Sequence, residues 1–476
     1  MSKRALTRRA GEFSGLAGAL LLGGCMNLMP KYERPAAPVA PAYAPELAPA
    51  GDAANVPNAA AAADIEWQRF FADPRLKRLI ELSLANNRDL RVAALNIEQA
   101  RALYQVRRAD ELPTVGAGVT AQRQPGATGL VNTYAVGVQV TGYELDFFGR
   151  VRSLSQAALA QYLATDEARK TAQIALIAGV ATTYVGILAD DELLRVTRET
   201  LKTREDSFRL TKLRFDNGVS SEIDLRQAEQ LLETARAALA QTQRQRALDE
   251  NALTLLVGQP LPADLPAPLP LAAQQGVTDL PAGLPSELLA RRPDLRSAEQ
   301  QLLAANASIG AARAAFFPRI ALTASAGTAS TELTGLFKSG TFALTGTATL
   351  LQPIFDAGRN QANLEVAKVN KDIAIAQYEK AIQTAFREVS DSLAGRATLG
   401  EQLRAQAAVA NAAQIGFNLA DLRYRNGVAS YFDVLDAQRN LFAAQQATVQ
   451  VQAAQVQNLV TLYKVLGGGW TEPKTN

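Results

Sequence analysis

The strongest constraint on the fold of this chain is an internal duplication, which divides most of it into two copies of one module. Residues 213–224 (LRFDNGVSSEID) align with residues 422–433 (LRYRNGVASYFD). Upstream, Asp89-Leu90-Arg91 aligns with Asp294-Leu295-Arg296, and in each copy a proline follows at the same distance. We therefore expect two repeats with the same order of secondary-structure elements.

Each copy begins with a helix that stops at a proline, over 89–112 and 294–317. Two strands with alternating apolar and small or polar residues follow, over 114–122 and 134–145 in the first copy and over 319–328 and 341–351 in the second. Two proline-free helices complete each copy. The long helices are predicted over 150–216 and 359–425, each about 100 Å long, and the return helices over 221–257 and 430–466.

The N-terminus has the features of an export signal. Basic residues precede the apolar stretch GLAGALLL, and small residues precede Cys25. This order resembles the lipobox of bacterial lipoproteins, which implies cleavage before Cys25 and a covalent lipid on its sulfur. The alternative is an ordinary signal peptide that ends near a free cysteine.

The domain organisation follows from these patterns and from an Ala/Pro-rich stretch that cannot bury a core. We predict a signal peptide (1–24), a lipidated N-terminus and linker (25–64), a first repeat (65–258), a Pro-rich segment (259–293), a second repeat (294–470) and a C-terminal tail (471–476).

Composition excludes several classes of function. The chain has no histidine and one cysteine, so His/Cys zinc sites, Ser-His-Asp and Cys-His catalytic groups and internal disulfides are excluded. The first 24 residues account for the net charge of +3, so nothing after them indicates a nucleic-acid partner. No uninterrupted apolar run reaches the roughly 18 residues of a membrane-spanning helix, so a helical integral membrane protein is not expected. We expect neither catalysis nor a cofactor other than the lipid on Cys25.

The strands have the length needed to cross an outer membrane. In lipid, every backbone polar group must be paired, so strands span a membrane only as a closed barrel. Four strands cannot close a barrel. The chain is therefore expected to oligomerise, and a dimer would supply 8 strands and a trimer 12.

Several short segments, together with the duplication, resemble the TolC-like outer-membrane factor family, in the lipoprotein branch of channels that serve RND-type pumps. They are DFFGR (146–150), DAGR (356–359), the two NGV turns, LDAQR (435–439) and LGGGW (466–470). The resemblance covers residues 67–470.

The resemblance implies an α+β membrane protein that forms a homotrimer. Its 12-stranded β-barrel in the outer membrane would be continuous with a 12-helix tunnel of coiled-coil-like helices in the periplasm. The channel would be the passive, gated exit of a tripartite pump, joined to a periplasmic adaptor protein and an inner-membrane transporter of the RND type. It would export drugs or toxic compounds and so contribute to antibiotic resistance. The Pro-rich segment and residues 67–87 would form a belt around the tunnel.

The two NGV turns are candidate sites of partner contact. The glycine after the asparagine can end a helix in the left-handed conformation, and the following valine is expected to pack back on the last turn. The serine is expected to cap the return helix. A well-made helical hairpin explains these residues as fully as a binding role does. The resemblance adds that the turns meet the adaptor, which makes Gly218, Val219, Ser221, Gly427, Val428 and Ser430 candidate contacts.

The second hairpin is the candidate gate. The resemblance implies that Phe432 and Asp436 match family positions that close the resting aperture. It also implies that Arg423, Tyr424 and Arg439 match positions that hold the aperture shut. Around a threefold axis, Phe432 would form an apolar constriction and Asp436 a ring of three carboxylates. The alternative for Asp436 and Arg439 is an ordinary surface ion pair at spacing i, i+3.

Two other classes of function remain open at this stage. A structural tether of the cell envelope would use the long helices as a spacer but would leave the strands unexplained. A periplasmic enzyme on a helical scaffold would need paired acids in a cleft, and the sequence shows no such pair.

Overall fold

The computed structural model describes most of the chain. The described residues are 26–43, 62–126, 129–274, 280 and 285–470. The predicted signal peptide, Cys25 and the C-terminal tail lie outside them.

The described residues form two compact units, and each unit takes segments from both repeats. The first unit contains, of the described residues, 26–37, 95–126, 129–167 and 297–380. The second contains, of the described residues, 38–43, 62–94, 168–274, 280, 285–296 and 381–470. The long helices pass from one unit into the other, so a repeat is not itself a compact unit.

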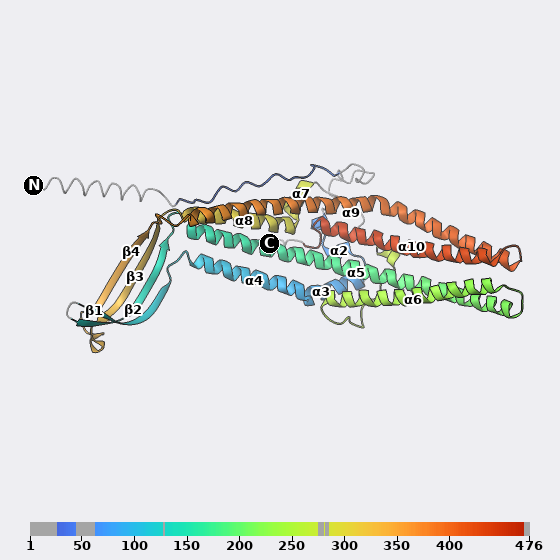
Figure 1. Cartoon of the computed structure of the whole chain (residues 1–476), viewed down its shortest axis with the longest axis horizontal. Helices are drawn as coiled ribbons and strands as arrows, with labels where there is room; N and C mark the ends of the chain where they lie inside the picture. Colours follow the sequence, from blue (N-terminus) through green and yellow to red (C-terminus); the bar gives the residue numbers. More distant parts are fainter. Residues whose placement is uncertain (1–25, 44–61, 127–128, 275–279, 281–284, 471–476) are drawn as a thin grey trace, which may run out of the picture. The chain divides into compact units, whose positions relative to one another are not determined.

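The four predicted strands are confirmed and form one antiparallel sheet in the first unit, in the order β1-β2-β3-β4 (Figure 1). They are β1 (Val115–Gly126), β2 (Gly129–Leu145), β3 (Arg319–Ser330) and β4 (Phe342–Leu351). The first two strands extend beyond their predicted bounds because their pairing continues to Gly126 and Gly129 at the hairpin.

The sheet has two chemically different faces, which the pairing register defines. Directly paired residues share a face, and successive residues along a strand alternate between faces. One row across the four strands is Val119, Val136, Thr328 and Phe342. The next row, on the opposite face, is Gly118, Gly137, Gly327 and Ala343. One face is therefore mainly apolar, and the other carries small and polar side chains.

The glycines of the second row have a steric role. A Cβ atom on Gly137 would lie 2.4 Å from the carbonyl oxygen of Ala326, and one on Gly327 would lie 2.2 Å from that of Val136. Real Cβ atoms do not approach backbone oxygen so closely, so β2 and β3 can lie this near to each other only with glycine at both positions.

The predicted helices are also confirmed, with small differences at their ends. They are α4 (Arg88–Ala109), α5 (Arg150–Asp216), α6 (Glu222–Val257), α8 (Pro293–Ala314), α9 (Arg359–Arg425) and α10 (Tyr431–Val465). Helices α4 and α8 end three residues earlier than predicted. The residue before a proline is disfavoured in the α region, and tighter turns such as Leu112 N–H to Ala109 O replace the last helical turn.

Helix α5 meets a test of length and mean hydropathy that a search for an uninterrupted apolar run does not detect. It contains an 18-residue window with a mean hydropathy of 1.8, long and apolar enough by length and composition to cross a membrane. Of that window, 61% is buried inside the protein, as in the core helix of a soluble protein. Scattered Thr and Gln side chains in residues 171–189 interrupt the apolar run without adding charge, which is why a search for an uninterrupted run misses it.

A buried carboxylate joins the Pro-rich segment to the first repeat in the second unit. Asp73 is fully buried and caps α3 (Pro74–Asn86) by accepting hydrogen bonds from backbone N–H groups at its start. Its Oδ2 also accepts from the Tyr184 hydroxyl (2.8 Å) and from the Gln274 side-chain amide (2.6 Å). These bonds tie α3, α5 and the segment after α6 together.

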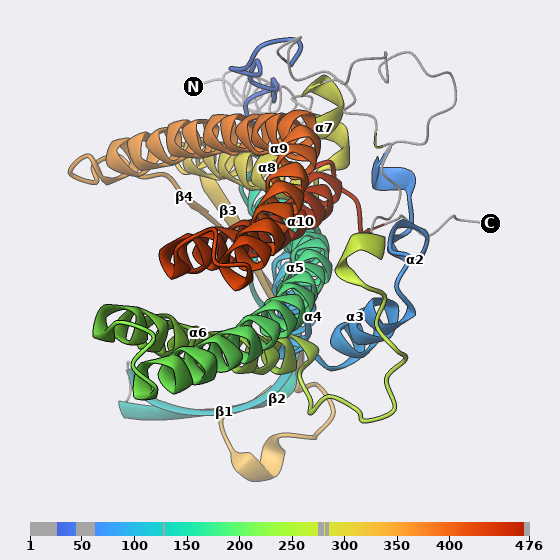
Figure 2. The same cartoon turned by 90° about the vertical axis from the view of Figure 1, so that its right-hand side faces the viewer.

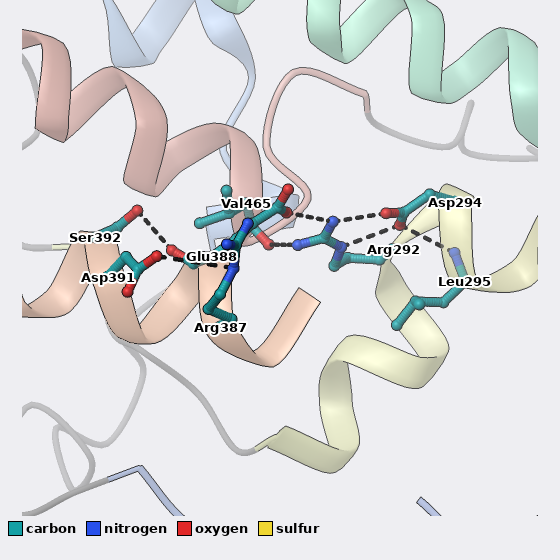
Figure 3. Close-up of polar contacts among 8 residues, drawn as sticks. All are labelled: Arg292, Asp294, Leu295, Arg387, Glu388, Asp391, Ser392 and Val465. Carbon is teal, nitrogen blue, oxygen red and sulfur yellow. Dashed lines mark hydrogen bonds and ion pairs between the residues drawn. The ribbon is translucent and has the colours of Figure 1, made fainter. Parts of the chain in front are cut away.

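The start of the second repeat is fixed by another buried side chain (Figure 3). Arg292 is 8% exposed, and its guanidinium donates to the Val465 carbonyl oxygen at 3.0 Å. It also pairs with Asp294 at 2.6 Å and with Glu388 at 2.8 Å. A single arginine thus joins the start of α8 to α9 and to the end of α10.

Candidate gate at the helical hairpins

The two hairpin turns share one local structure, as the duplication predicts. Gly218 and Gly427 both have φ of 74°. The following valine N–H donates to a carbonyl oxygen five residues back, at 2.9 Å in both copies, which is the closure of a Schellman turn. Ser221 and Ser430 each form a capping box with the aspartate three residues later. The predicted helix-stop and helix-start signals are therefore confirmed.

The valines of these turns do not behave as expected. Val219 is 63% exposed and Val428 is 66% exposed, so neither packs back on the last turn of its helix. Both side chains lie mainly in solvent, although their backbone N–H groups close the Schellman turns. Ile223 and Phe432 on the return helices are also exposed. Each hairpin end thus presents an apolar surface.

The two hairpins meet within the second unit, and Figure 2 shows both pairs, α5 with α6 and α9 with α10, facing the viewer. An apolar cluster joins them, formed by Ala228, Leu231, Tyr431, Val434 and Leu435, with Phe208, Phe417, Ala420 and Tyr424 partly buried against it. Because its members come from all four helices, separating the hairpins would expose this cluster to water.

Polar contacts extend the joint between the hairpins. The Arg214 guanidinium donates to the Tyr424 hydroxyl and lies 5.0 Å from the centre of its ring. The Gln438 side-chain amide donates to the Ser207 hydroxyl at 3.1 Å. These two contacts connect α5 with α9 and α10.

Arg204 is the most buried charge in this region, with 3% of its surface exposed. It donates to the Leu231 carbonyl oxygen at 2.9 Å and lies over the Phe442 ring. Burial, and then the nearby charge of Arg439, lower the pKa of the Arg204 guanidinium. No carboxylate within ion-pair distance compensates it among the described residues, so its charge depends on the Leu231 carbonyl within the first hairpin and on the Phe442 ring of the second.

The predicted gate residues are only partly brought together. Asp436 pairs with Arg439 at 3.1 Å, both side chains being 50% exposed, and Asp436 also accepts from Asn440. Within one chain, this is the i, i+3 surface pair that the sequence allowed as the alternative. The exposed Arg423 contributes its backbone carbonyl to the turn, and its side chain has no polar partner in the described part of the chain.

The partner of Tyr424 is Arg214, which occupies the position in the first copy that Arg423 occupies in the second. Sequence reasoning that followed one copy at a time missed Arg214, and it also missed Arg204, Ser207 and Gln438. The duplication could have identified Arg214, because it places Arg214 and Arg423 at equivalent positions and so makes both candidates for contact with Tyr424.

Comparison with known proteins decides the family. Residues 79–259 and 284–468 match the model of the outer membrane efflux protein family. The chain belongs to this family. It is 48% identical over 468 residues to the probable efflux pump outer membrane protein TtgC of Pseudomonas putida, covering 95% of this chain and 94% of that protein. It is 44% identical over 470 residues to the outer membrane protein OprJ of Pseudomonas aeruginosa, covering 97% and 96%.

A solved structure agrees with this assignment. The efflux protein resembles the open state of the MtrE outer membrane channel of Neisseria gonorrhoeae, with a TM-score of 0.84 and 42% identity over 93% of this chain and 98% of that one. The efflux protein is therefore an outer-membrane component of an efflux system, with the predicted α+β fold. Its family consists of transporters, and the alternative of a periplasmic enzyme is set aside.

Proposed function

We propose that three copies of this efflux protein form a gated exit duct across the outer membrane, with a 12-stranded barrel above a 12-helix periplasmic tunnel. The observation that carries the proposal is the sheet with one apolar and one small or polar face. Strands β1 and β4 each have one unpaired edge in a single chain. Pairing β1 of one copy with β4 of the next satisfies these edges, turns the apolar face to lipid and encloses the polar face.

The duct would act passively with two partners, a periplasmic adaptor and an inner-membrane transporter of the RND type. The names of relatives mention efflux of toluene and of antibiotics, so small toxic compounds are the proposed cargo. The exposed apolar ends of both hairpins, with Val219 and Val428 at their tips, support the adaptor contact. Gly218, Ser221, Gly427 and Ser430 set the shape of these ends.

The proposed lipid anchor is Cys25. The adjacent Met26 N–H donates to the Phe147 carbonyl oxygen at 3.0 Å, directly after β2. Asn27 packs closely on Gly149, where a Cβ atom would lie 3.4 Å from its Cα. These contacts hold the chain at the end of the sheet, so acyl groups on Cys25 would begin beside the membrane-spanning strands.

The proposed gate combines the joint between the hairpins with residues repeated around the threefold axis. Phe432 is 53% exposed in one chain and would narrow the aperture when three copies meet. Asp436 would add a ring of three carboxylates, and the neighbouring Arg439, Arg423 and Tyr424 would hold the closed arrangement. Adaptor binding would favour a second arrangement in which the hairpins separate.

Two measurements on the purified, processed protein test the duct. Native mass spectrometry in detergent should show a trimer, and planar bilayers should show discrete channels. A stable monomer or dimer would contradict the assembly. A protein that acts only as an envelope tether would form no channels.

A further inference from the structure

A β-bulge at the end of β2 changes which face of the sheet carries charge. The register passes from Val140 paired with Ala324 to Tyr143 paired with Leu322, and Gly142 within the bulge has φ of 65°. After the bulge, Glu144 pairs with Ala321. Without it, strict alternation would place Glu144 on the apolar face with Val140. The bulge instead puts Glu144 on the small or polar face.

Arg319 lies on this same face, two residues before Ala321. Its guanidinium forms an ion pair with Glu144, which also pairs with Arg150 at 2.7 Å. The Glu144 side chain is only 10% exposed, whereas that of Arg319 is 58% exposed. One covered carboxylate therefore faces two guanidinium groups, and Arg319 presents its positive charge to solvent.

Arg359 adds a further positive charge at the same place. It lines a cavity of about 300 Å³ together with Glu144, Arg150 and Arg319. Arg359 is the counterpart of Arg150 in the second copy, but residues 350–355 (LLQPIF) contain no acid that could serve as a second Glu144. Its exposed side chain makes no ion pair in the described part of the chain.

Asp146 is the second carboxylate that lines the cavity, and it is already engaged. Its Oδ2 accepts from the Arg152 backbone N–H at 2.8 Å, at the start of α5. Asp356 similarly accepts from the Asn360 N–H at the start of α9. The positive ends of these two helices offset both charges. The cavity lining thus has three arginines against two engaged carboxylates.

We propose that Arg319 and Arg359, with Arg150 and Glu144 supporting them, form a positively charged collar inside the duct that favours anionic solutes such as carboxylates and sulfonates. The proposal rests on the proposed function, because only a closed barrel turns this face inward. Three copies would place the collar at one level, where the strands join the helices. Rings of arginine attract anions in pores, and the rest of the enclosed face carries mainly Gly, Ser, Thr and Gln.

The test is the reversal potential of single channels formed by the full processed chain in planar bilayers under a KCl gradient. Dilute salt is needed, since the Debye length is about 30 Å at 0.01 M and about 8 Å at physiological ionic strength. The double variant Arg319→Gln/Arg359→Gln should lower the chloride-to-potassium permeability ratio about twofold or more. Arg359→Gln alone, an exposed and unpaired position, should lower it in the same direction without affecting folding.

Lys338→Gln is the matched control, because it removes one positive charge from the exposed connection between β3 and β4, away from the cavity. It should leave the permeability ratio unchanged. If the wild-type protein forms channels but neither arginine variant changes the chloride-to-potassium permeability ratio, the collar is overturned and the duct stands. Absence of channels from the wild-type protein would refute the duct and, with it, the collar.

Discussion

The contact between Arg214 and Tyr424 offers a sharp test of how the tip is held closed. Tyr424→Phe removes only the hydroxyl that accepts the hydrogen bond from Arg214. The ring remains in the apolar cluster, and Arg214, which is partly exposed, keeps water as an alternative partner. The substitution therefore isolates one bond between the first and second hairpins without leaving a buried charge unpaired.

The size of the effect follows from the chemistry of the bond. A hydrogen bond with a charged donor contributes about 1.5–3 kcal/mol, and partial exposure of this pair favours the lower value. If the bond is present only in the closed arrangement, its loss shifts the opening equilibrium by about 1.5 kcal/mol, or about tenfold for each copy. Concerted opening of three copies would multiply these factors.

The assay is the open probability and basal conductance of single channels in planar bilayers, with thermal unfolding measured in parallel. Tyr424→Phe should raise the open probability at least tenfold and change the unfolding temperature little. Tyr104→Phe is the control, since Tyr104 stacks on Tyr162 and its hydroxyl has no hydrogen bond in the described part of the chain. Equal open probabilities in the wild type and in both variants would refute a role for this contact in closure.

Three further predictions concern other charged or modified groups. Asp436→Ala should raise basal conductance or reduce cation preference. Gln227→Ala, at the matching position of the first copy, should do neither. Channels with the same properties in both variants would show that Asp436 only forms surface contacts with its neighbours. Burial, and then repulsion from Asp249, raise the pKa of Asp190 to about 7. The folded chain keeps this proton from about pH 4 to pH 7 while the unfolded chain loses it, so stability should fall over that range and then level off. Asp190→Asn should remove the fall, which unfolding temperatures at pH 5 and pH 8 would reveal; an unchanged fall would contradict the assignment. Cys25→Ser should abolish metabolic labelling with palmitate, and label that persists in the variant would exclude Cys25 as the attachment site.

Local features of this protein were predictable because their causes lie within a few residues. The left-handed glycines at 218 and 427 and the capping boxes at Ser221 and Ser430 depend on hydrogen bonds that span three to five positions. The long helices follow from proline-free sequence, and the strands from alternation. Because the sequence is duplicated, each of these features could be predicted from both copies, and the two predictions agreed. The element order was therefore predicted correctly.

Contacts between distant segments were decided only by the tertiary structure. Tyr424 meets Arg214 rather than Arg423, although the two arginines have equivalent local sequences. Glu144 faces Arg319 because a bulge shifts the register between strands from different repeats. Asp73 accepts hydrogen bonds from Tyr184 on α5 and from Gln274 in the segment after α6. Periodicity determines which side of an element is apolar, but the partner of a polar side chain depends on how elements far apart in sequence pack. The sequence by itself therefore determined the elements, their caps and the family, and the packing determined which charges meet.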